Sequence, residues 1–131
     1  PWCKSSWKGL RKHAEAFTTL GTRVIGVSAD TPETLTKDFM RRYELPYTQL
    51  SDPQLEIAER LDVPTLGAPH PAALKYPERR FLQPALFIWL QSGELAHQWR
   101  QTPTLKTLYG ARGRPSPEDV LRHVREALGE A

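Results

Sequence analysis

Apolar residues recur every three or four positions in several parts of the chain, which is the spacing of amphipathic helices. In the last three of these segments a Thr, Asp or Ser stands directly before a proline, a pair typical of a helix start. Gly21 is placed to end the first segment. The predicted helices run from Trp7 to Leu20, from Pro32 to just before Pro46, from Pro53 to Leu61 and from Pro117 to Leu128.

Short apolar or alternating runs between the helices predict strands. Residues 23–28 should be buried on both faces, residues 47–50 form a short strand, and residues 85–90, the strongest apolar run, form the central strand. Residues 95–100 alternate and should pair antiparallel to the strand before them. Five prolines (64, 69, 71, 77 and 84) predict a long ordered loop between 63 and 84.

Helices that alternate with strands, followed by a late hairpin, indicate an α/β fold with a central mixed β-sheet flanked by helices. The length fits a single domain over residues 1–131. A cysteine at a helix start is normally presented by a buried strand before it, so we expect this domain to lack its N-terminal strand. The sheet edge beside residues 23–28 would then be open and would favour a homodimer.

Composition excludes several classes of function. Apolar residues make up 39% of the chain and no run approaches a membrane span, while the net charge of +3 is scattered rather than concentrated in a nucleic-acid patch. The four histidines lack ligand spacing, so we expect no metal and no other cofactor. A single cysteine argues for a reducing compartment, which we take to be the cytoplasm.

Cys3 is the strongest candidate for chemistry. It directly precedes the first predicted helix, with Lys4 and Lys8 close by. Unpaired N–H groups, the positive end of the helix dipole and nearby lysines all favour the thiolate, so the pKa of this thiol should be depressed. We expect more ordinary roles for three other residues: Asp30 helps to cap the next helix, Trp89 is core and His97 is half-buried and structural.

Four passages together resemble the thioredoxin-fold superfamily, and within it the peroxiredoxin-like alkyl hydroperoxide reductase and thiol-specific antioxidant family. Residues 2–6 resemble the Trp-Cys-x-x-Cys signature with Ser6 in place of the second cysteine. Residues 23–33, 43–53 and 84–88 are similar to a buried strand ending in Ser-x-Asp, a Leu-Pro to Ser-Asp passage and the strand after the variable loop. The resemblance implies a thioredoxin-like three-layer sandwich.

The resemblance also implies site residues. Thioredoxins place a cis-proline against the active cysteine, so we predict that Pro84 is cis and that Pro84 and Trp2 contact the substrate. Relatives carry an arginine next to this proline, where the present chain has Gln83. Arg80 or Arg100 could replace that arginine by folding over the site.

The resemblance and the single thiol lead to a one-cysteine peroxidase cycle in which Cys3 is oxidised by peroxide and restored by an external thiol. Two alternatives stay open: a monothiol disulfide exchanger in which Ser6 donates a hydrogen bond to the thiolate, and a non-catalytic module that binds a partner through Trp2 and the long loop. Peroxide consumption separates the first from the others, and capture of a mixed disulfide on Cys3 separates the second from the third.

Overall fold

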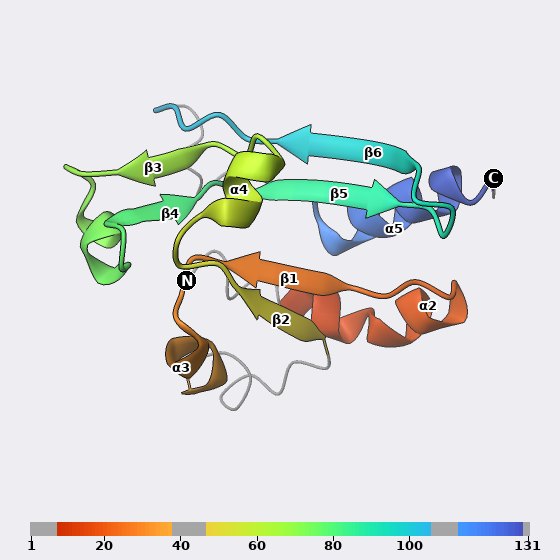
Figure 1. Cartoon of the computed structure of the whole chain (residues 1–131). Helices are drawn as coiled ribbons and strands as arrows, with labels where there is room; N and C mark the ends of the chain where they lie inside the picture. The colour runs from red at the N-terminus through yellow and green to blue at the C-terminus, as the bar shows by residue number, and fades with distance from the viewer. Residues whose placement is uncertain (1–7, 38–46, 106–112, 130–131) are drawn as a thin grey trace.

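The computed structural model describes residues 8–37, 47–105 and 113–129. Within these ranges helices and strands alternate first and two antiparallel strand pairs follow, so the prediction of an α/β fold is confirmed. Helices α2 (Ala14–Thr19) and α5 (Pro117–Ala127) lie behind the strands in Figure 1, and α4 (Glu56–Arg60) lies in front of them.

The first strand pair is parallel. Strand β1 (Ile25–Ser28) pairs with β2 (Thr48–Ser51), with Ile25 opposite Thr48 and Ser28 opposite Ser51. The crossover between them starts at α3 (Pro32–Thr34), which Thr31 caps as predicted by accepting from the backbone N–H of Thr34. The prediction that residues 23–28 are buried on both faces is wrong. Gly26 is buried but Ile25 is 49% exposed, because α2 lies on one face of this pair and leaves Ile25 on the other.

The core lies between α2, α5 and the strands. Phe17 is 1% exposed and packs with Leu121 and Val124, and the partly buried Val24 and Ile88 close this cluster from the strand side. The predicted first helix is present, but it is interrupted: residues 8–12 are helical, residue 13 is a turn and α2 follows. Gly21 ends it in a left-handed conformation with φ +66°, as its position predicted.

Helix α4 begins three residues later than the Asp52-Pro53 pair indicates. The buried carboxylate of Asp52 nevertheless caps it, because Oδ1 accepts from the N–H of Glu56, and Oδ2 accepts from those of Ile57 and Ala58. The sequence therefore identified the capping residue but not the register of the helix. The intervening Leu55 has φ 62°, and this local turn delays the helix.

The prediction of a loop without regular structure over residues 63–84 is wrong, because this range contains two strands and a short helix. Strand β3 (Thr65–Gly67) pairs antiparallel with β4 (Arg80–Leu82), and a 3₁₀ helix, η2 (Pro71–Lys75), connects them. The prolines stand outside the strands, so they interrupt no ladder hydrogen bond. Tyr76 and His70 each pack a ring against Phe81, which holds the connection onto β4.

Strand β5 (Ala85–Trp89) pairs antiparallel with β6 (Leu95–Arg100), and Gly93 forms the turn, as predicted. The expectation that Trp89 is core is wrong, since Trp89 is 50% exposed and stacks on Phe87 at 5.6 Å between ring centroids. These two rings alternate with Leu86 and Ile88 along β5 and so stand on the face away from α5.

The last helix agrees with the sequence closely. Ser116 and Asp119 form a capping box, with Asp119 N–H donating to Ser116 Oγ at 3.1 Å and Ser116 N–H donating to Asp119 Oδ2 at 3.0 Å. These bonds lower the pKa of Asp119, the backbone N–H of Ser116 being the largest cause. Leu121 and Val124 point into the core, as the apolar spacing predicted.

In the part of the chain that the structure describes, strands pair two by two: β1 with β2, β3 with β4, and β5 with β6. No ladder joins β1 to β5 among these residues. The predicted mixed sheet is thus present as three separate strand pairs among the described residues. The pair β1–β2 is parallel, and the pairs β3–β4 and β5–β6 are antiparallel.

Candidate functional site

Three of the predicted site residues, Trp2, Cys3 and Ser6, lie outside the described residues. The structure describes the other two, Arg80 and Pro84, and also the helical segment 8–12 that follows Cys3 in the chain. The candidate site is therefore defined here by the elements that hold that segment and by the link between β4 and β5.

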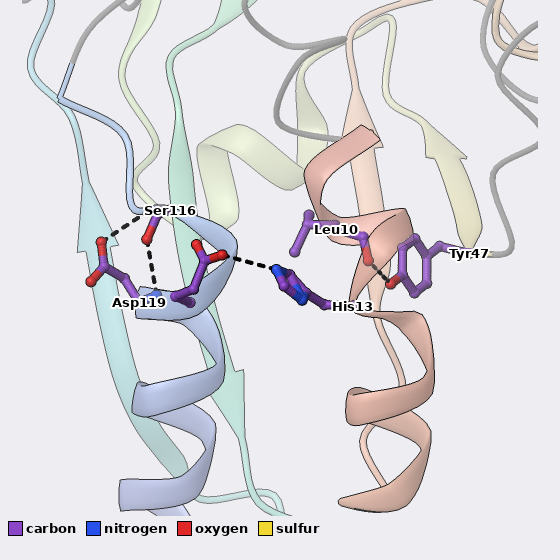
Figure 2. A network of polar contacts seen from close by, with 6 residues as sticks. Leu10, His13, Tyr47, Ser116 and Asp119 are labelled. Carbon is purple, nitrogen blue, oxygen red and sulfur yellow. Dashed lines mark hydrogen bonds and ion pairs between the residues drawn. The ribbon is translucent and has the colours of Figure 1, made fainter.

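The helical segment after Cys3 is tied to the rest of the fold by two side-chain contacts. The hydroxyl of Tyr47 donates to the carbonyl of Leu10, and His13 Nε2 lies 3.0 Å from Glu118 Oε1 at the start of α5, as Figure 2 shows. Tyr47 is buried, and desolvation raises the pKa of its phenol. The phenol therefore stays protonated at neutral pH and keeps its donor role.

Gly9 allows the same segment to approach α5 closely. A Cβ atom at this position would lie 2.7 Å from Cγ of Pro117, nearer than real Cβ contacts come. Any larger residue would push the first helix away from the N-terminus of α5. The segment that follows Cys3 is thus positioned by Gly9 and His13 against α5, and by Leu10 against Tyr47.

Arg80 lies on β4 with its backbone opposite Gly67. Its guanidinium is engaged locally, since Nε and Nη2 donate to Thr65 Oγ1 at 2.9 and 2.8 Å. Arg100, the other arginine considered from the sequence, donates from Nε to the carbonyl of Leu61 at 2.8 Å and stands over the Phe87 ring. That either arginine folds over Cys3 stays a prediction.

Pro84 connects β4 to β5. Among the described residues the cis peptide bond is Ala68–Pro69, so the prediction of a cis bond at Pro84 is wrong. The backbone continues extended through this point: Gln83 N–H donates to the carbonyl of Pro64 at 2.9 Å, and Gln101 N–H donates to that of Pro84 at 3.0 Å. A residue before proline favours this extended conformation.

Gln83 stands directly before Pro84, at the position where the resemblance implies an arginine. Its side chain is 2% exposed, and neither Oε1 nor Nε2 has a hydrogen-bond partner in the described part of the chain. Buried amides are almost always paired, so an unpaired one demands an explanation. The sequence could not predict that the Gln83 amide is buried without a partner, because the burial of one side chain depends on the tertiary packing around it.

Asp30 follows β1 at the carboxyl end of the parallel pair, where ligand sites of open α/β sheets gather. Its carboxylate accepts from the Ser28 hydroxyl, and its carbonyl accepts from Ser51 Oγ at 2.6 Å. Thr31 Oγ1 caps the next helix by accepting from Thr34 N–H, and that Asp30 helps it to do so stays a prediction. Through its contacts with Ser28 and Ser51, Asp30 joins the ends of β1 and β2.

The histidines have structural partners. His70 Nδ1 accepts from the N–H of Ala72 and so caps η2, while His97 is half-buried, as expected, and stacks on His123 with ring centroids 3.9 Å apart. Residues 8–37, 47–105 and 113–129 contain no group of three or more His, Cys, Asp or Glu side chains that could hold a metal ion. The same residues contain no helix long and apolar enough to cross a bilayer.

Comparison with known proteins gives two curated relatives. The chain is 38% identical over 63 residues to "Putative peroxiredoxin bcp" of Haemophilus influenzae, a match that covers 48% of this chain and 40% of that protein. It is 39% identical over 64 residues to "Peroxiredoxin Q, chloroplastic" of Gentiana triflora, covering 49% of this chain and 29% of that protein. The matches thus span less than half of either relative.

A family model gives wider coverage. The AhpC/TSA family model matches residues 1–98, which include the predicted site residues Trp2, Cys3, Ser6, Arg80 and Pro84. The matched range runs from the first residue into β6, so it contains the parallel pair, the connection through η2 and most of the β5–β6 hairpin. With a thioredoxin-like α/β architecture and this match over most of its length, the chain belongs to the AhpC/TSA family.

Proposed function

We propose that this chain is a thiol-dependent peroxidase that uses Cys3 in a one-cysteine cycle. The observation that carries the proposal is the family match over residues 1–98, which contains the chain's only cysteine. Both curated relatives bear the name peroxiredoxin, which supports the same chemistry. A family of thiol peroxidases needs a reactive thiol, and Cys3 is the only residue of this sequence that can supply one.

The reaction follows from thiol chemistry. The sulfur of Cys3 attacks one oxygen of a hydroperoxide and the O–O bond breaks; the thiol proton goes to the departing oxygen. Sulfur is oxidised by two electrons to sulfenic acid, and the peroxide is reduced to an alcohol or to water. An external thiol then condenses with the sulfenic acid to release water, and a second external thiol frees Cys3 as a disulfide leaves.

The remaining predicted residues receive roles within this cycle. Ser6 donates a hydrogen bond to the Cys3 thiolate, Trp2 and Pro84 form part of the substrate surface, and Arg80 stabilises the charge that develops on oxygen. Arg80 would have to leave Thr65 Oγ1 to do so, and this exchange replaces a neutral partner by an anionic one, which forms the stronger hydrogen bond. The reductant is a small or protein thiol, and a reducing compartment such as the cytoplasm suits the lone cysteine.

The experiment measures peroxide consumption by the chain with dithiothreitol as reductant, for the native sequence and for Cys3→Ser. We expect turnover from the native chain and none from the variant. Alkylation by iodoacetamide across a pH series should show a midpoint below the free-cysteine value of about 8.5, because only the thiolate reacts.

Two results would contradict the proposal. Turnover that survives in Cys3→Ser would place the chemistry elsewhere. A native chain that forms a mixed disulfide on Cys3 with an oxidised peptide, but does not consume peroxide, would indicate a monothiol disulfide exchanger instead.

A further inference from the structure

We draw no further inference here: the strongest candidate, the cavity of about 460 Å³ between α2 and the residues that lead into β1 and β2, has a polar lining of exposed or half-buried threonines, Arg23 and Tyr47, whose hydroxyl already donates to Leu10, and nothing in the structure shows what ligand would occupy it.

Discussion

At the scale of single residues, the described part of the chain shows how one buried carboxylate can organise a turn. Asp52 is 4% exposed, and its two oxygens accept from three successive N–H groups at the start of α4. Its own N–H donates to the carbonyl of Ser28 at 2.7 Å, which ties the turn to β1. The first turn of α4 depends on this side chain, because these N–H groups have no partner within the helix.

Replacing Asp52 by alanine should therefore lower the free energy of unfolding by about 2 kcal/mol, at the upper end for a lost helix cap. Urea denaturation measures the change. Glu59→Ala is the control, since Glu59 is exposed on the same helix and should change stability by less than about 0.5 kcal/mol. An equal decrease in the free energy of unfolding in the two variants would show that the hydrogen bonds of the Asp52 cap do not stabilise the fold.

At the scale of elements, α5 is attached to β6 through a pair of imidazole rings. His97 on β6 stacks on His123 of α5 with an angle of 18° between the ring planes, and His123 Nδ1 lies 3.5 Å from Glu126 Oε2. Burial, and then the nearby His123, lower the pKa of His97, while Glu126 acts in the opposite direction. The packing of α5 on β6 thus favours the neutral form of His97.

This arrangement predicts a loss of stability in mild acid. A folded-state pKa below the unfolded value of about 6.5 means that the unfolded chain takes up the proton first, so stability is full above pH 6.5 and falls as the pH drops below it. In His97→Phe, which keeps an aromatic ring against His123, the part of this decline due to His97 should vanish. Thermal unfolding of both chains across a pH series tests this. A decline of equal steepness in the variant would mean that other groups cause it.

At the scale of the whole molecule, the face opposite α2 and α5 carries apolar side chains without full cover. Ile25, Leu50 and Trp89 are 49%, 41% and 50% exposed. The ladders β1–β2 and β5–β6 also leave their facing edges without ladder bonds among the described residues. Unpaired edges beside exposed apolar residues favour association with another strand.

We therefore expect residues 1–131, prepared as given, to form dimers through the edge of β1. Light scattering across a concentration series measures this. Ile25→Lys should yield monomers, because a lysine on an edge strand opposes pairing with another chain. Leu74→Lys is the control, since Leu74 is 66% exposed but belongs to η2, away from the β1 edge. A native chain that remains monomeric at every concentration would contradict the expectation.

The predictable parts of this fold are those with a local cause. The sequence predicted four features correctly: the Ser116 cap, the apolar spacing of α5, the left-handed Gly21 and the turn at Gly93. Each depends on residues within a few positions of one another. The hairpin β3–β4 was missed for the same reason. Its prolines argued for a loop, whereas pairing of Thr65 with Leu82 is a contact between distant residues that outweighs local preference.

The sequence by itself determined the family and the α/β class, since these rest on the order of residues along the chain and on apolar periodicity. That Cys3 is the reactive residue stays a prediction. Only the tertiary structure decided which side chains are buried from solvent. It exposed Trp89, kept Pro84 out of the cis conformation, engaged Arg80 with Thr65 and buried the Gln83 amide without a partner. The physical reason is that solvation depends on every element packed around a residue, whereas helix spacing and capping depend only on its neighbours in the chain.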